Sequence, residues 1–352
     1  MSAIIAIIAF GVLIFIHELG HFIFAKLFGV YVEKFSIGFG PKIFGKKIGE
    51  TEYQLSVIPL GGYVKMYGEQ PDDEIEPTLM EKSFKNKNLW QKSLIVFAGP
   101  LFNYLLAIFL FWIVFLKGVP VLKPVIGNVN ENMPAKLAGL EKGDTIIKIN
   151  GIDIKTWDDM ATIIKSSPNK PLNITFKRGE DIKEVTITPK ISTSKNIFGE
   201  DIEVGLLGIS PSGDQMILRY NIIEALDKGV KKCWEIVELT FLGIYKMIQR
   251  VVPADNIGGP ILIFQMTKDA ASFGIVPLLT FVAVISINLA ILNLLPVPVL
   301  DGGHLLIYLI EAIIRRPLSE KAKGIAMRIG MSLLLLLMVF AFYNDITRLF
   351  RK

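Results

Sequence analysis

The residues best suited to chemistry are two histidines with three residues between them, the first of which is a glutamate. His17 and His21 are four positions apart, so on a helix they share one face and can bind the same Zn²⁺ ion. Glu18 stands where it can take a proton from a water held by that ion. The chain has 3 histidines, and this motif uses two of them. The spacing predicts a zinc site with Glu18 as the catalytic base.

The surroundings of this motif argue against a chance match. Five-residue patterns with two free positions occur in unrelated proteins, but this one ends an apolar run that begins at Ile4. Ionisable groups inside a membrane span are costly and mark functional sites. The neighbours Phe15, Ile16 and Phe22 offer no hydrogen-bond partner, whereas a metal would satisfy one nitrogen on each ring. A bound metal is therefore the favoured explanation.

A third ligand is expected from the segment 293–304, which reads Asn-Leu-Leu-Pro-Val-Pro-Val-Leu-Asp-Gly-Gly-His. Its prolines and glycines should break a helix, and non-helical backbone at membrane depth is tolerated only where protein buries it or where it lines a cavity. A catalytic zinc takes three protein ligands, so Asp301 is predicted to complete the set. Asp301 could instead pair with a lysine or cap the next helix. His304 either steadies an oxyanion or a ligand, or simply starts that helix.

The composition is that of an integral membrane protein. The chain has 352 residues, 51% of them hydrophobic, and a mean hydropathy of +0.48. Stretches long enough to span a bilayer cover residues 3–25, 93–116, 277–295 and 325–342, which predicts about four transmembrane helices. The net charge of +5 comes from loops beside these stretches, which indicates membrane topology and no nucleic-acid partner. The single cysteine, Cys233, excludes an intrachain disulfide.

The basic residues also predict an orientation. Lysines spread over 26–92 and a basic cluster over 315–323 both belong in the cytoplasm by the positive-inside rule. Residues 117–276 then fall outside. The histidine motif starts roughly 14 residues into its span, or about 21 Å, which places it in the cytoplasmic half of the bilayer. We expect a multi-pass membrane protein with the lipid bilayer as a partner. The family resemblance given below implies that this membrane is the bacterial inner (cytoplasmic) membrane.

Two segments outside the spans are predicted to be rich in β-structure. Residues 35–41 and 53–66 have a period near two and should form short strands separated by Gly and Pro turns, followed by a solvated acidic loop at 72–76. Residues 133–151 read as a short helix, a glycine turn, a strand and an Asn-Gly hairpin, within a small domain at 119–210. This order resembles a PDZ domain, which binds a peptide or protein ligand at an open sheet edge. A mere spacer is the alternative.

The chain therefore divides into four parts. An N-terminal membrane half (1–118) precedes the PDZ-like domain (119–210), and an amphipathic region (211–275) precedes the C-terminal membrane half (276–352). Within the third part, residues 219–250 should form a helix that lies on the membrane surface, with a fifth span as the alternative. The predicted fold class is an α-helical polytopic membrane protein with a β element and an inserted PDZ-like, β-rich domain. The family resemblance described next implies that the β element is membrane-reentrant.

The ordered set of motifs resembles the site-2 protease family, peptidase M50, in particular its bacterial regulator-of-sigma-E protease type. The features that carry the resemblance are the His17 motif, Asn293–Gly302, the PDZ-like domain, Phe97–Asn103 and Gly258–Ile261. The resemblance covers nearly the whole chain. The best-known members carry two tandem PDZ domains, whereas this chain has room for one.

The resemblance implies an intramembrane zinc metalloprotease with Zn²⁺ as its cofactor. The zinc ligands would be His17, His21 and Asp301, and the catalytic base would be Glu18. The substrates would be transmembrane proteins, such as anti-sigma factors or remnant signal peptides.

The resemblance also implies substrate-binding residues in two places. The path lined by the irregular segment would include Asn293, Pro296 and Pro298. The reentrant β element would contribute Gly38, Gly62 and Tyr63. Two other functions stay open. A membrane-anchored PDZ scaffold with a vestigial zinc site would need none of the intact ligands, and a protease for soluble peptides would need a site open to water from outside.

Overall fold

The computed structural model describes residues 2–70 and 75–350, so residues 72–74 of the predicted acidic loop lie outside the described residues. In this part of the chain, four helices are long and apolar enough to cross a membrane, and they coincide with the four predicted spans. These are α1 (Ser2–Leu27), α2 (Leu89–Lys117), α7 (Ile275–Asn293) and α9 (Glu320–Phe350). The other long helices are α5 (Ile222–Ile248), α6 (Pro260–Ser272) and α8 (Asp301–Ile314). Residues 219–250 are thus mostly helical, as predicted.

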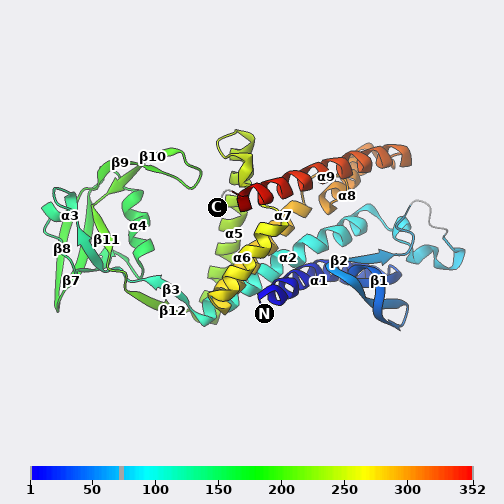
Figure 1. Ribbon diagram of the computed structural model, residues 1–352, viewed down its shortest axis with the longest axis horizontal. Helices are drawn as coiled ribbons and strands as arrows, with labels where there is room; N and C mark the ends of the chain where they lie inside the picture. The colour runs from blue at the N-terminus through cyan, green and yellow to red at the C-terminus, as the bar shows by residue number, and fades with distance from the viewer. Residues whose placement is uncertain (1, 71–74, 351–352) are drawn as a thin grey trace. The chain divides into compact units, whose positions relative to one another are not determined.

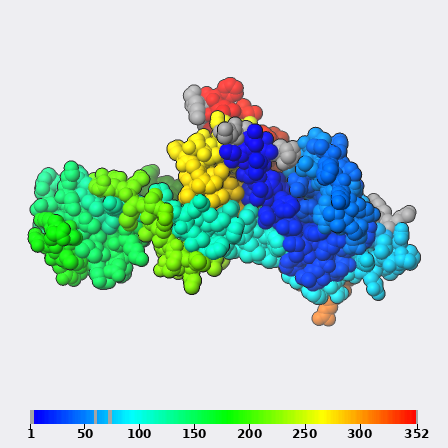
Figure 2. Space-filling model, turned by 90° about the horizontal axis from the view of Figure 1, so that it is seen from below, coloured from blue at the N-terminus to red at the C-terminus, as the bar shows by residue number. Residues whose placement is uncertain are grey.

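The chain forms two compact units, and the first holds residues 1–114, 222–242 and 254–352. In this unit α1 contacts the strands β1 and β2 as well as α6 and α7, and Figure 2 shows α1 in dark blue beside the lighter blue strands and the yellow helices. The helices α1 and α2 meet at Gly20, where a Cβ atom would lie 2.3 Å from the carbonyl oxygen of Ala98. Only glycine permits so close an approach.

The predicted β element is a hairpin of two long, bent strands, β1 (Val32–Ile48) and β2 (Thr51–Met66), drawn beside α1 in Figure 1. Residues 34–37 of β1 pair with 52–55 and with 62–65 of β2. The prediction of short strands ended by Gly and Pro turns was wrong here. Gly38 and Gly40 have φ of +93° and +87°, and such residues bend a strand without ending it.

The hairpin buries several polar side chains and exposes several large apolar ones. Its inner side chains Ser36, Gln54 and Ser56 are buried, and the Gln54 amide donates a hydrogen bond to the hydroxyl of Tyr63 at 3.0 Å. Large apolar side chains on the outside are exposed, namely Phe39, Ile43, Phe44, Ile48, Leu55, Val57 and Ile58. A contiguous apolar surface of this kind marks contact with lipid or with another protein.

The helix break predicted for the segment that starts at Asn293 is confirmed. Helix α7 ends at Asn293 and α8 begins at Asp301, with an irregular loop between them. Val299 in this loop has φ of +120°, which a β-branched residue rarely adopts. The loop packs so tightly on its neighbours that a Cβ atom at Gly303 or at Gly330 would lie 2.4 Å or 1.8 Å from a loop carbonyl oxygen. Two glycines on two helices thus make room for the loop.

The second unit, residues 115–221 and 243–253, contains the β-rich domain. Its sheet has the order β6-β5-β7-β8, formed by β5 (Thr145–Ile149), β6 (Ile152–Asp153), β7 (Leu172–Arg178) and β8 (Asp181–Ile187). Three antiparallel pairs complete it: β3 (Val119–Leu122) with β12 (Gln215–Leu218), β4 (Ile126–Val129) with β11 (Ile209–Pro211), and β9 (Lys190–Lys195) with β10 (Asp201–Leu206).

The helices of the β-rich domain are α3 (Pro134–Leu137) and α4 (Trp157–Lys165), and α4 begins with a capping box on Thr156. The expected order of helix, glycine turn, strand and hairpin is present. Asn150 and Gly151 both have positive φ, as a two-residue hairpin turn between β5 and β6 requires. The apolar core includes Ile126, Leu140, Ile146, Ile149, Met160, Leu172, Ile174, Phe176 and Leu207.

One buried carboxylate ties this domain together. Asp144 is fully buried and accepts two hydrogen bonds from Arg178, from Nε and from one terminal nitrogen, each at 2.8 Å. The other terminal nitrogen of Arg178 bonds Glu141 at 2.9 Å. Asp144, the nearest of these acceptors, raises the pKa of the guanidinium. The pair fixes the end of β7 to the turn before β5.

Replacing Arg178 should destabilise this domain. Arg178→Met leaves a buried carboxylate without its partner, and we expect a loss of about 3 kcal/mol in the free energy of unfolding. Urea unfolding of the full chain in detergent, followed by limited proteolysis of the domain, measures this. The adjacent Lys177 pairs with the exposed Glu180, so Lys177→Met is the matched control and should cost less than about 1 kcal/mol. Equal losses for the two variants would contradict the prediction.

Candidate metal centre

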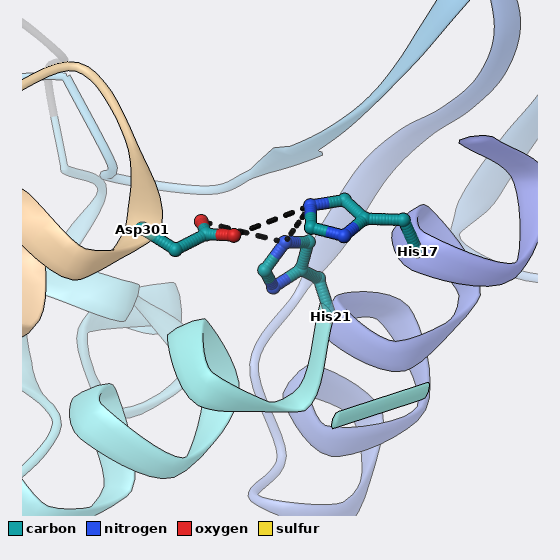
Figure 3. A group of neighbouring side chains, drawn as sticks. All are labelled: His17, His21 and Asp301. Atoms are coloured by element: carbon teal, nitrogen blue, oxygen red, sulfur yellow. Dashed lines mark hydrogen bonds and ion pairs between the residues drawn. The ribbon is translucent and has the colours of Figure 1, made fainter. Parts of the chain in front are cut away.

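Three side chains from distant parts of the sequence point toward one place in the first unit. Figure 3 shows His17 and His21 on α1 facing Asp301, which stands in the first turn of α8. Nε2 of His17 lies 3.2 Å from Oδ2 of Asp301, and Nε2 of His21 lies 3.6 Å from Oδ1. Their possible ligand atoms all lie within 4.8 Å of one another. The structure thus brings the three predicted ligands together.

The arrangement fits a tetrahedral zinc ion. The two Nε2 atoms are 3.2 Å apart, and two nitrogens bound to one tetrahedral zinc would be about 3.3 Å apart. The rings stand at 86° to each other, so both can present Nε2 to a common point. His17 and His21 are only 8% and 9% exposed. Two imidazoles and a carboxylate are the usual donors for this metal, and the buried position excludes bulk water from competing.

Helix α2 supplies the partners that the sequence reasoning did not find. Nδ1 of His21 donates to the carbonyl oxygen of Ile95 at 2.9 Å, which leaves Nε2 free for a metal. Nδ1 of His17 lies 3.2 Å from Nδ2 of Asn103. The signal in the sequence was the Gly99-Pro100 pair inside an apolar span, which marks a special site in a helix. The residues that flank the histidines along α1 offer no hydrogen-bond partners, but residues of α2 do, so the expectation that the rings lack protein partners was wrong.

Gly99 leaves the space that the imidazole rings occupy. A Cβ atom at this position would lie 2.3 Å from Nε2 of His21 and 2.9 Å from Cε1 of His17. The metal-facing atoms of both rings therefore lie directly on the backbone of α2. Any side chain here would have to displace the rings.

The strand β2 runs past Glu18. A Cβ atom at Gly62 would lie 3.1 Å from Cγ of Glu18, so glycine lets the strand come close. Tyr63 stacks on Phe39 at 6.3 Å between ring centroids. Glu18 thus lies between the metal-binding face of α1 and the last segment of the hairpin.

Gly38 lies elsewhere in the hairpin, where a Cβ atom would meet the carbonyl oxygen of Ile58 at 2.8 Å. This close contact makes Gly38 a bend in β1 that packs on β2.

The predicted substrate residues of the irregular loop lie at different distances from the centre. Nδ2 of Asn293 lies 3.4 Å from Nε2 of His17, so this residue lies directly beside the candidate centre. Pro296 is exposed and Pro298 half-buried in the loop that follows. The ring of His304 lies 6.5 Å from that of Tyr308 and is not in the group of possible ligands among the described residues.

The alternatives considered for Asp301 do not match its contacts. Leu300 is the residue that caps α8, and among the described ion pairs the carboxylate of Asp301 contacts the two histidines and no lysine. Its place in the first helical turn is favourable for a negative charge. The helix terminus therefore supports this carboxylate and leaves both oxygens free to face the rings.

A model of the family described as Peptidase family M50 matches residues 5–337. The chain belongs to peptidase family M50. A Campylobacter jejuni protein named as a zinc metalloprotease is 42% identical over 350 residues, which cover 99% of this chain and 93% of that protein. A regulator of sigma-E protease from Salmonella typhimurium is 32% identical and covers 97% of this chain and 98% of its own length. The chain is thus a zinc metalloprotease.

Two further comparisons concern the β-rich domain. The alignment with the Salmonella protein runs over 446 positions, more than the 352 residues of this chain, so that relative contains inserted sequence. The solved PDZ domain of an SdrC-like protein from Listeria innocua matches 25% of this chain and 92% of its own, with 27% identity and a TM-score of 0.20. So low a score adds nothing to the resemblance seen in the sequence.

Filling the space at Gly99 should weaken metal binding. We expect Gly99→Ala to displace both rings and to lower zinc affinity by about tenfold or more, the size typical of changes next to metal ligands. Competition with a chromophoric chelator measures the affinity. Gly11, also in a membrane helix, has no atom within 4 Å of its hypothetical Cβ, so Gly11→Ala is the control and should bind zinc normally. Unchanged affinity in Gly99→Ala would contradict this account.

Proposed function

We propose that this protein cleaves peptide bonds within or near the transmembrane segments of membrane proteins, using zinc held by His17, His21 and Asp301. The observation that carries the proposal is the meeting of these three side chains, from two helices about 280 residues apart in sequence, beside Glu18. The apolar character of α1 and α7 supports a site below the membrane surface.

Each residue of the centre has a distinct task. When bound, zinc supplies a Lewis acid that polarises the scissile carbonyl and makes water nucleophilic near neutral pH. Glu18 accepts the proton of the attacking water and passes it to the leaving amine. Asn293, next to His17, and the prolines after it line the path of the substrate.

The hairpin is proposed to enter the membrane and present the substrate. Its exposed apolar side chains suit contact with lipid, while its polar groups bond each other inside. A helical substrate must unwind before water can reach its carbonyl groups, and an edge strand offers replacement hydrogen bonds. The segment 62–66 pairs with β1 and passes Glu18, so Gly62 and Tyr63 lie on the strand that would guide the unwound chain.

We further propose an inner-membrane location with the zinc in the cytoplasmic half and the β-rich domain on the outer, periplasmic side. The basic loops at 26–92 and 315–323 support this orientation through the positive-inside rule. The β-rich domain would take a peptide or protein ligand in the manner of a PDZ domain, and α5 would lie along the membrane surface. Anti-sigma factors and remnant signal peptides are the substrate classes proposed, because one relative is named as a regulator of sigma-E protease.

Removing the base should stop catalysis without releasing the metal. Glu18→Gln keeps the size of the side chain but cannot accept a proton, so we expect a rate lower by about 10²-fold to 10⁴-fold. Cleavage of a transmembrane reporter in proteoliposomes measures the rate, and zinc content by mass spectrometry should equal that of wild type. Glu50→Gln, at an ion pair with Lys26 away from the centre, should cleave normally. Wild-type cleavage by Glu18→Gln would refute the assignment of the base.

Removing the carboxylate charge should release the metal. Asp301→Asn retains the shape of the side chain but binds zinc weakly, and we expect most of the zinc to be lost on dialysis. Zinc content before and after dialysis is the measurement. Asp269→Asn, an exposed acid on α6, is the matched control and should keep its zinc. Full zinc occupancy in dialysed Asp301→Asn would show that this residue is not a ligand.

A further inference from the structure

The two histidines of the centre face opposite kinds of partner on α2. Nδ1 of His21 lies 2.9 Å from the carbonyl oxygen of Ile95, which can only accept a hydrogen bond. Nδ1 of His17 lies 3.2 Å from Nδ2 of Asn103, and an amide nitrogen only donates. Hence Nδ1 of His21 is arranged to carry a proton, whereas Nδ1 of His17 is arranged to accept one.

Metal binding reverses what His17 requires. A neutral imidazole that binds a metal through Nε2 carries its proton on Nδ1 and needs an acceptor there. As the side chains stand, this N–H would point at the donor group of Asn103. The acceptor is close at hand, because Oδ1 of Asn103 is buried and has no hydrogen-bond partner among the described residues. A half-turn of the amide would exchange the two atoms.

The surroundings of Asn103 hold its backbone while leaving its amide able to turn. Asn103 is fully buried, and the Ser286 hydroxyl of α7 donates to its backbone carbonyl oxygen at 2.7 Å. The two ends of the amide have nearly the same shape. After the half-turn, Nδ2 of Asn103 lacks a partner and Oδ1 has one, so the number of hydrogen bonds made by the amide does not change.

We propose that Asn103 is a positioning residue of the metal centre: its amide turns so that Oδ1 accepts the Nδ1–H of His17, which fixes this ring for zinc binding through Nε2. The proposal rests on the proposed function, in which His17 is a zinc ligand. Asn103 acts through His17 and touches neither the metal nor the substrate.

Two substitutions separate an accepting role from a donating one. Asn103→Leu has a similar volume and no polar atoms, so it should weaken zinc affinity by about 10-fold to 100-fold. Asn103→Asp can accept but cannot donate, so its affinity should stay close to that of wild type. The measurement is titration of the metal-free full chain in detergent with Zn²⁺, against a chromophoric chelator.

The controls distinguish metal positioning from helix packing. Ser286→Ala removes a buried hydrogen bond at the same contact of α2 with α7 without touching the amide, and it should bind zinc like wild type. Thermal unfolding with and without Zn²⁺ gives a second readout. In Asn103→Leu the shift in Tm produced by Zn²⁺ should shrink, and in Asn103→Asp it should return.

The outcomes that overturn the proposal are distinct from failure of the metal site itself. Normal zinc affinity in Asn103→Leu, or an equal loss in the Leu and Asp variants, would show that the amide does not serve as an acceptor for His17. A separate variant tests the proposed function itself. If His17→Ala binds zinc as well as wild type does, His17 is not a zinc ligand and the proposed function fails. If His17→Ala loses zinc while Asn103→Leu keeps it, only the role of Asn103 is wrong.

Discussion

The structure depends on burying three ionisable side chains among apolar helices, where every polar atom needs a partner. His17 and His21 meet this requirement by lying directly on α2, with one ring bonded to a backbone carbonyl and the other facing Asn103. Asp301 meets it by facing the two rings from the start of α8. A divalent cation at their common point would balance the charge and replace the close contact between the two Nε2 nitrogens.

Close backbone contacts make this possible. Gly20 and Gly99 let α1 and α2 approach until the rings lie on the facing backbone, and Gly303 and Gly330 let the loop before Asp301 pack between helices. Glycine is usually unfavourable in a helix interior. At these positions it destabilises the helix locally but allows the close backbone contact. The loop itself includes Val299 in a strained conformation, and such strain persists where the surrounding structure holds the backbone in place.

The hairpin β1–β2 has both an exposed apolar surface and a segment that lies beside the candidate metal centre. Buried polar side chains bond each other inside it, several large apolar side chains on it are exposed, and Gly62 lets its last segment pass close to Glu18. This element therefore offers a backbone edge beside the proposed base. The β-rich domain is a separate compact unit with its own core and its own buried ion pair.

Much of this protein could be predicted from short-range patterns. The apolar runs determined the four long helices, because length and hydropathy alone decide whether a segment can span a bilayer. The spacing of His17 and His21 determined a shared helix face, and the prolines and glycines after Asn293 determined a break in the helix. Each of these properties depends only on residues that are close together in the sequence, so each could be predicted without the structure.

Only the tertiary structure decided which distant atoms meet. Asn103 and the carbonyl group of Ile95 lie more than seventy positions from their histidines, and no local pattern in one sequence links residues so far apart. The long bent strands also differed from the predicted short ones, since a glycine ends or bends a strand according to what packs against it. Partners and close contacts arise from packing between elements, and packing is a property of the folded chain as a whole.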